Sequence, residues 1–245
     1  MLNSLYSNAV RQLGKAVDMS ERHGKVAFSP SFVRSQADGA QPPLARLIQG
    51  GRGGEVRLKL YLCITMMATA EPHDIRRPPV PYAWARMLAL PPETGPRRVT
   101  NNLKWLSRNG FIELEARRGS TPAIKLVSLE APDLPYVRAS TQGRYIGIPL
   151  EFWRNGWILR LSPTGIALLF TLLESQGGYE EARYVTSERR DTYGLSHNTW
   201  TKGRKELEQY GFLTVKRTPQ GTDFDYRRLR NSYWIDEGKF SEKPN

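Results

Sequence analysis

The sequence has little of the residue types that build metal sites and nucleophilic active sites. It contains one cysteine, Cys63, and three histidines that lie far apart. A single cysteine excludes an intramolecular disulfide and a thiolate cluster, and dispersed histidines argue against a zinc site. Cys63 stands among Leu62, Ile64 and Met66, which predicts a buried, inert thiol. We therefore expect no enzymatic activity and no bound cofactor or metal.

Long apolar runs and acidic residues are also scarce. No stretch of about 18 apolar residues occurs, so no membrane span is expected, and residues 1–18 lack the apolar core of a signal peptide. Asp and Glu total 24 against 36 Lys and Arg, which gives a formal charge of +12. With 39% hydrophobic residues the chain can bury a core. These features predict a soluble, cytoplasmic protein, and its positive charge suits nucleic acid or another anionic surface without choosing between them.

An internal repeat relates two parts of the chain at an offset of 101 residues. Gly110-Phe111 aligns with Gly211-Phe212, and each pair ends a helical pattern and begins an apolar strand pattern. Glycine suits the left-handed residue that terminates a helix. A second glycine, in a turn, then precedes another strand in each copy, which predicts a β-hairpin.

Both copies have the order helix, helix, turn, helix, hairpin. The first copy has predicted helices at 56–69, 81–90 and 95–109 and a second hairpin strand at 123–128. The second copy has predicted helices at 164–175, 188–193 and 197–210 and a second hairpin strand at 223–230. The expected N-caps in this copy are Ser162, Thr186 or Ser187, and Ser196.

The remaining segments are predicted from periodicity and from turn residues. Residues 2–19 have helical spacing, residues 24–43 are rich in loop signals, and Gly50–Gly54 predicts a flexible break. Residues 131–160 are rich in aromatic and β-branched residues. They predict an ordered strand and short helix packed on the second copy, with the tryptophans in the core.

The segment from Tyr193 to Leu213, YGLSHNTWTKGRKELEQYGFL, resembles the helix-turn-helix core of GntR-like regulators. The segment from Arg97 to Ile112, RRVTNNLKWLSRNGFI, has the same exit into a strand but follows a longer turn. The resemblance implies the winged-helix form of the helix-turn-helix. Two such units in one chain also resemble plasmid replication initiators.

The expected fold is mainly α with small β-hairpins (α+β), with two winged-helix domains in tandem and an N-terminal helical extension. The predicted boundaries are 1–54 for the N-terminal helix and flexible segment, 55–130 for the first winged helix, 131–160 for the bridge, 161–236 for the second winged helix and 237–245 for the tail.

In a helix-turn-helix the second helix of the pair enters the major groove, so the resemblance implies DNA contacts from one helix of each copy. The implied contact residues are Arg97, Arg98, Thr100, Asn101 and Lys104 in the first copy and His197, Asn198, Thr199, Thr201, Lys202 and Lys205 in the second. Those on the hairpin wings are Arg117, Arg118, Lys216, Arg217, Arg227 and Arg228. A solvated helix face and protection of edge strands would explain the same residues without DNA.

The leading hypothesis is a sequence-specific protein that binds double-stranded DNA, a transcriptional regulator of bacterial, plasmid or phage origin. It implies a cytoplasmic, nucleoid-associated protein with no membrane partner. The alternatives are a replication initiator or partition protein of the same fold, and a winged-helix scaffold that binds protein. Residues 2–19, which have an apolar face, are a possible site of homo-oligomerisation.

Overall fold

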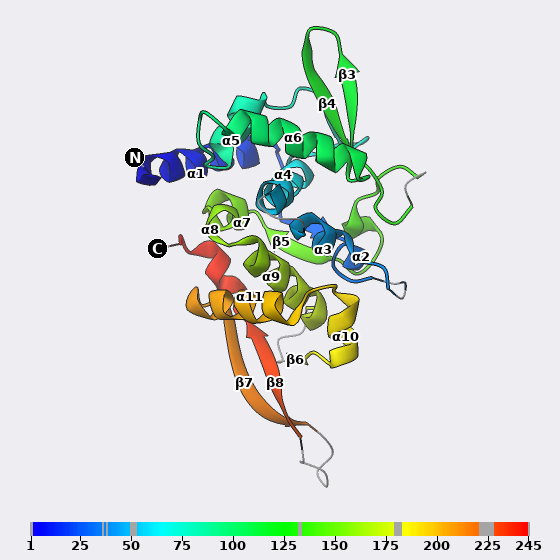
Figure 1. Ribbon diagram of the computed structural model, residues 1–245, viewed down its shortest axis with the longest axis vertical. Helices are drawn as coiled ribbons and strands as arrows, with labels where there is room; N and C mark the ends of the chain where they lie inside the picture. The colour runs from blue at the N-terminus through cyan, green and yellow to red at the C-terminus, as the bar shows by residue number, and fades with distance from the viewer. Residues whose placement is uncertain are drawn as a thin grey trace.

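The computed structural model describes residues 2–35, 37, 39–49, 53–131, 134–178, 183–220 and 228–244. Within these residues the protein is an α+β fold, in which helices accompany three small antiparallel sheets. The molecule is elongated, and a hairpin projects from each end of its long axis (Figure 1). Both ends of the chain lie on the left-hand side of that view.

One series of elements occurs twice along the chain. The first unit, residues 54–126, consists of α4 (Gly54–Met67), β2 (Asp74–Ile75), α5 (Pro81–Met87), α6 (Gly95–Arg108), β3 (Ile112–Arg117) and β4 (Ser120–Leu126). The second unit, residues 163–235, consists of α9 (Pro163–Gln176), β6 (Arg183–Tyr184), α10 (Ser187–Thr192), α11 (His197–Gln209), β7 (Leu213–Gln220) and β8 (Arg228–Ile235). The sheet orders are β2-β4-β3 and β6-β8-β7. The repeat therefore extends to the sheet topology, including a third strand in each unit that the sequence did not indicate.

The junction between helix and hairpin has the same geometry in both units. Gly110 and Gly211 have φ values of +74° and +75°, in the left-handed region that favours glycine. The next residues, Phe111 and Phe212, are fully buried. Each donates its backbone N–H to the carbonyl five residues earlier, at 2.9 Å. This pair of bonds and glycines closes the helix and fixes the direction of the strand that follows.

Capping side chains set the helix starts of the second unit. Ser162, Thr186 and Ser196 each accept a hydrogen bond from the backbone N–H three residues on, at 3.1, 3.2 and 3.1 Å. The predicted caps are confirmed, and Thr186 rather than Ser187 caps α10.

The longer hairpin corrects a predicted boundary. The second strand was expected at residues 223–230, whereas β8 runs from Arg228 to Ile235. The hairpin register pairs Leu213 with Ile235, directly after the helix exit. Because Ile235 is thereby tied to the base of the hairpin, the strand extends farther toward the C-terminus than the predicted turn implied. Residues 223–227 of the predicted strand lie outside the described residues.

Gly203 marks the closest approach of α11 to α9. A Cβ at this position would lie 2.7 Å from the carbonyl oxygen of Thr164 and 3.0 Å from the Cβ of Leu168. The backbone of α11 therefore packs directly on the backbone and side chains of α9, with no room for a methyl group.

Gly203→Ala is expected to lower the free energy of unfolding by about 1–3 kcal/mol, because the helices must separate to admit the methyl group. Denaturant titration of the full chain measures this change. Gly14→Ala is the matched control, since Gly14 lies in a helix with nothing within 4 Å of the added Cβ. That change is expected to stabilise by about 0.4–1 kcal/mol through the unfolded state. Equal effects of both substitutions would contradict the packing argument.

The N-terminal segment, residues 2–49, contains more structure than the sequence indicated. It comprises α1 (Leu2–Met19), as predicted, and then β1 (Lys25–Phe28), α2 (Pro30–Val33) and α3 (Pro43–Ile48). The prediction of a loop over 24–43 was therefore wrong for β1 and α2. β1 pairs with β5 (Ile146–Pro149), which lies more than a hundred residues later, so local sequence signals do not reveal it.

α3 connects the two units. The Arg46 guanidinium donates to the carbonyl of Asn109 at 2.8 Å, at the end of α6. On the other side, Pro42 and Ala45 pack against Gly194, in the turn before α11. The N-terminal segment therefore touches the recognition-like helix of one unit and the turn of the other. This contact gives the segment a structural role.

α1 packs within the same chain. Its residues Ala9, Leu13, Ala16 and Val17 are buried. Asp18 at its end pairs with Arg154 at 2.8 Å. The apolar face of α1 is thus covered by other parts of the same chain. It does not need a second chain to bury it, so it gives no support to the predicted oligomerisation.

The bridge, residues 131–160, is ordered where it is described. It contains a short 3-10 helix η2 (Ala139–Thr141), then β5, α7 (Glu151–Arg154) and α8 (Trp157–Arg160); a further 3-10 helix, η3 (Glu237–Ser241), follows β8. Trp153 and Trp157 are buried, as predicted for core residues. The bridge also packs on the N-terminal segment through β1–β5 and α1–α7, not on the second unit alone. One continuous apolar core results, from Leu13 to Phe240.

Two smaller expectations concern the middle of the chain. Gly54 is not part of a break but the first, buried residue of α4. Gly50, Gly51 and Arg52 lie outside the described residues. Cys63 is buried, and burial raises the pKa of its thiol to about 12, which confirms an inert cysteine.

Candidate nucleic-acid interface

An exposed polar stripe runs along α6. Arg97, Asn101, Lys104 and Arg108 are exposed and recur at steps of four, three and four residues, which places them on one helix face. α6 contains four basic and no acidic residues. Within the described part of the chain no carboxylate forms an ion pair with these cations. The α6 stripe is therefore a face of uncompensated positive charge with one amide.

The other two predicted contact residues of α6 are placed differently. Arg98 and Thr100 are half-buried. The Thr100 hydroxyl donates to the Pro96 carbonyl at 3.0 Å, so its donor is already used within the helix. The structure brings Arg97, Asn101 and Lys104 together at the surface and sets these two at the edge of that face.

α11 presents a similar but less basic face. His197, Asn198, Lys202 and Lys205 are exposed, and Thr199 and Thr201 are half-buried. The Thr199 hydroxyl lies 2.9 Å from that of Ser196, as part of the helix cap.

Two acidic residues of α11 have partners within the second unit. Glu206 accepts a hydrogen bond from the Ser162 backbone N–H at 2.7 Å and so fastens α11 to the start of α9. Arg204 pairs with Glu208 at 3.8 Å. The two units therefore differ in charge on otherwise comparable helices.

The predicted hairpin residues fall into three groups. Arg118 lies exposed at the tip of the first hairpin, and Arg217 is exposed on the second. Arg117 donates to the carbonyl of Arg76, and Lys216 lies 5.7 Å from the Trp234 ring, so both are held against their own unit. Arg228 is the first residue of β8, and Arg227 lies outside the described residues.

Sequence reasoning missed three cations of this surface. Arg108 continues the α6 stripe, three helical turns after Arg97, and helical periodicity alone would have included it. Arg76 and Arg77 are exposed beside Arg117, because β2 pairs with β4. β2 has two residues and no sequence signature, so nothing in the sequence places these arginines near the hairpin.

Figure 1 shows how the two helix faces are disposed. α6 runs from left to right below the upper hairpin, and α11 runs from right to left above the lower hairpin. A half-turn in the plane of the picture therefore brings one unit approximately onto the other. The chain thus contains two similar surfaces in an approximately two-fold arrangement.

A buried carboxylate, Glu174, holds the helix pair of the second unit in place. Its side chain is fully buried and pairs with Arg189 of α10 at 3.2 Å, Arg144 of the bridge at 3.5 Å and Arg34 of the N-terminal segment at 3.8 Å. The Tyr193 hydroxyl donates to the same carboxylate at 2.6 Å. Three separate parts of the chain therefore meet at Glu174, near the C-terminal end of α9.

In the variant Tyr193→Phe, the free energy of unfolding is expected to fall less steeply at alkaline pH than in the wild type. Burial, together with the adjacent Glu174, raises the pKa of Tyr193 from 10.0 to about 12. The raised value means that its contribution to stability is complete below pH 10 and disappears as the pH rises through about 12. Denaturant midpoints of both proteins, measured up to that pH, give the comparison. Parallel curves would contradict the assigned hydrogen bond.

Comparison of the chain with protein-family models, with curated proteins and with solved structures found no match. Among the described residues, no group of three His, Cys, Asp or Glu side chains is placed to hold a metal ion. No helix in the same residues has both the length and the apolar character needed to cross a bilayer.

Proposed function

We propose that the chain is a sequence-specific protein that binds double-stranded DNA through two winged-helix units. The order helix, strand, helix, helix, hairpin, with the first strand paired to the last, supports this assignment for both units. In it α6 and α11 are the recognition helices and the hairpins are the wings. The observation that carries the proposal is that this whole arrangement, including an exposed polar face on the third helix, occurs twice in one chain.

The relation between the units supports binding to a single duplex. Successive major-groove faces of B-DNA lie about 34 Å apart, and dimeric helix-turn-helix proteins match them with a two-fold axis. Here the approximate half-turn between the units supplies that symmetry within one chain (Figure 1). The two units share one core and are joined by α3, which keeps the spacing of α6 and α11 constant.

The two proposed recognition helices, α6 and α11, are not equivalent, so the DNA site need not be palindromic. α6 has four basic and no acidic residues, whereas α11 has three basic and two acidic ones. Arginine forks onto guanine and asparagine pairs with adenine, so Arg97 and Asn101 are the residues assigned to base edges in the first unit. By the offset of 101 residues, Asn198 and Lys202 have the corresponding positions on α11.

The test is selection of bound fragments from random duplex DNA with the full chain, followed by a salt series on the selected site. The expected result is one enriched motif with two unequal half-sites about 10 base pairs apart and an affinity that falls steeply with salt. Absence of any salt-dependent binding would reject DNA recognition and leave the protein-binding scaffold.

Transcriptional regulation is the role we propose first, and initiation of plasmid or phage replication is the second. One observation favours the second role: the two units are fixed together by a continuous core, as suits a protein that binds an asymmetric site as a single chain. The genomic position of the selected motif separates the two, because an operator lies at a promoter and an initiator site recurs at an origin.

A further inference from the structure

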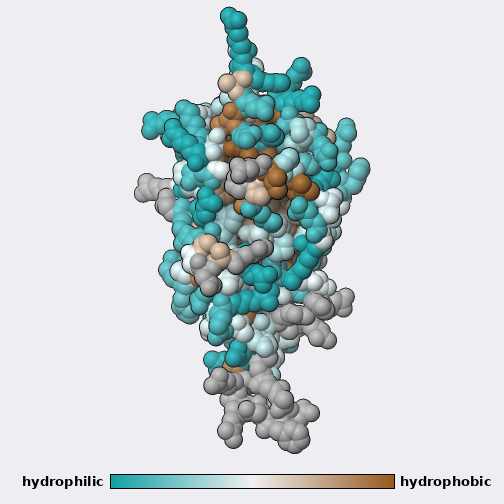
Figure 2. All heavy atoms as spheres, turned by 90° about the vertical axis from the view of Figure 1, so that its right-hand side faces the viewer, coloured by the Kyte–Doolittle hydropathy of each residue, from teal (hydrophilic) through white to brown (hydrophobic). Residues whose placement is uncertain are grey.

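A cavity of about 300 Å³ lies where the N-terminal segment meets the first unit and the bridge. Its walls come from β1, α2, α4 and residues 128–131 and 134–142. It opens on the side of the molecule that Figure 2 faces, where apolar residues gather in the upper half of a mostly hydrophilic surface. Ligand pockets commonly have about 300–1,000 Å³, so the cavity has the size of a small-molecule site.

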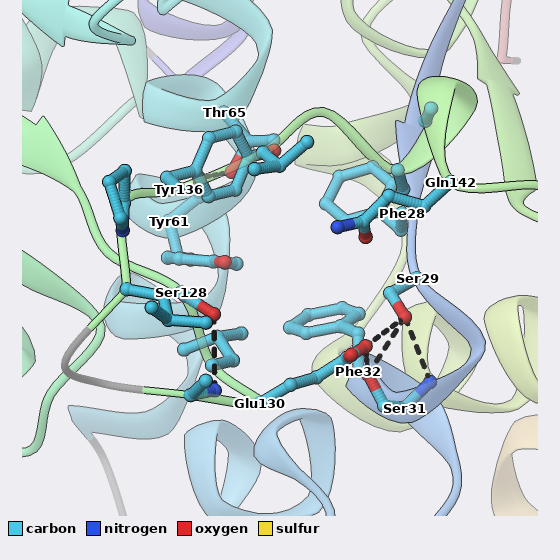
Figure 3. Close-up of a pocket in the computed structure, with 17 residues that line it drawn as sticks. Phe28, Ser29, Ser31, Phe32, Tyr61, Thr65, Ser128, Glu130, Tyr136 and Gln142 are labelled. Carbon is cyan, nitrogen blue, oxygen red and sulfur yellow. Dashed lines mark hydrogen bonds between the residues drawn. The ribbon is translucent and has the colours of Figure 1, made fainter.

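Aromatic rings make up much of the wall. Phe28 and Phe32 have ring centroids 5.3 Å apart, and Phe32 stacks on Tyr61 at 5.5 Å. Tyr136 lies across from Phe28 in Figure 3. Leu134 and Val137, on the rim, are 63% and 48% exposed. Such a wall favours a flat, largely apolar molecule.

One carboxylate stands at this aromatic wall. Glu130 accepts hydrogen bonds from the Ser29 hydroxyl at 2.5 Å and from the Ser31 hydroxyl, as the dashed lines in Figure 3 show. These two bonds hold the pKa of Glu130 below its usual value, so it is ionised at neutral pH. Glu130 is exposed, and within the described residues no Lys, Arg or His forms an ion pair with it. Arg34 and Arg144 line a neighbouring hollow that Glu130 also borders, but both pair with Glu174. The carboxylate is therefore held by two hydroxyl groups and not by an ion pair.

We propose that this cavity binds a small organic cation with a planar aromatic group. The ring would lie against Phe28, Phe32 and Tyr61, and the ammonium group would pair with Glu130. Aromatic faces also attract cations, so the two features of the wall favour the same ligand class. The charge of the site selects against anionic molecules of the same shape.

A ligand bound in the cavity would influence how the two units are placed relative to each other. β1 and α2 belong to the segment that joins the units, and α4 belongs to the first unit. The lining residues 134–142 precede β5, the strand that pairs with β1. A ligand that contacts all of these favours one arrangement of them over others. DNA affinity then changes with ligand by the same free energy as ligand affinity changes with DNA. This link rests on the proposed DNA binding, whereas the site itself does not.

The experiment measures binding of four cationic probes to the free full-length chain by calorimetry and by ligand-observed NMR. The probes are benzylamine, phenethylamine, tryptamine and 4-aminoquinoline, with tryptophol and indole-3-acetate as neutral and anionic counterparts of tryptamine. We expect at least one cation to bind, tryptamine to bind better than its counterparts, and Glu130→Gln to weaken cation binding about tenfold or more. Glu93→Gln is the control, because it removes an exposed carboxylate outside the cavity lining.

Two results would overturn the site: none of the four cations binds, or the wild type and Glu130→Gln bind them equally. A change of more than about threefold in DNA affinity at saturating probe, a small but measurable coupling free energy, would support the link to DNA. An unchanged DNA affinity would overturn the link and leave the site. If the chain binds probe but no DNA, the proposed function fails and the site stands.

Discussion

Replacing Arg97 and Lys104 together by alanine is expected to lower the affinity for the selected DNA site at least about thirtyfold, since each groove contact contributes about 1–3 kcal/mol and two together contribute at least about 2 kcal/mol. Both side chains are exposed on a helix without acidic residues, so their charge is available to DNA. The slope of log affinity against log salt should fall by about 0.9 for each lost phosphate contact. Fluorescence anisotropy on the selected site between about 50 and 200 mM salt measures both quantities.

The matched control is the double substitution Arg11→Ala and Lys15→Ala, which removes the same charge from the exposed side of α1. It is expected to change affinity only slightly, because α1 packs against α4, α5 and α7 and is not one of the two helices assigned to the major groove. If the control weakens binding as much as the α6 pair does, the net charge of +12 and not the α6 face governs binding.

The second unit has a comparable pair of exposed lysines, Lys202 and Lys205, at the positions of Asn101 and Lys104, and they belong to a helix with two acidic residues. We therefore expect Lys202→Ala with Lys205→Ala to cost less affinity than the α6 pair, and to relax the sequence preference of the other half-site. Selection with this variant tests both statements. Loss of preference in the α6 half-site instead would reverse the assignment of the two units.

Glu174→Ala is expected to lower the free energy of unfolding by about 2–3 kcal/mol, because hydrogen bonds to a charged group contribute about 1.5–3 kcal/mol. The estimate is below the 3–5 kcal/mol typical of a broken buried ion pair. The reason is that the arginines it leaves behind are partly exposed, with side-chain exposures of 32%, 53% and 37% for Arg189, Arg144 and Arg34. They regain water when the carboxylate is lost.

Denaturant titration measures the effect of Glu174→Ala, and Glu174→Gln separates charge from hydrogen bonding. The glutamine side chain still accepts from Tyr193 but does not neutralise the arginines, so an intermediate loss is expected. Asp191→Ala is the control, since it removes an exposed carboxylate from α10 and is expected to change stability by less than about 0.5 kcal/mol. An unaltered midpoint for Glu174→Ala would show that the cluster does not stabilise the fold.

Short-range chemistry explains why much of the fold follows from the sequence. Ser162 and Ser196 cap helices through bonds to residues three positions away, and Gly110 and Gly211 end helices through their own backbone angles. These interactions need no distant partner, so the helices and the start of each hairpin were predicted close to their observed places.

Elements that depend on distant partners were missed for the same reason. β1 has four residues and is defined by its pairing with β5, and β2 has two and is defined by β4. The aromatic cavity likewise forms only when Phe32, Tyr61 and Tyr136 come together from three separate parts of the chain. No spacing within the sequence relates these residues.

The sequence by itself determined the two series of helices and hairpins, the cationic residues on α6 and α11, and the buried character of Cys63. Local periodicity and capping decide these features, because they act within a few residues. Only the tertiary structure decided that α3 joins the units and that Glu174 collects three arginines. It also decided that Glu130 borders an aromatic cavity and forms no ion pair within the described residues. Apart from the Arg189–Glu174 pair, these features arise from contacts between segments at least 30 residues apart, which chain folding alone brings together.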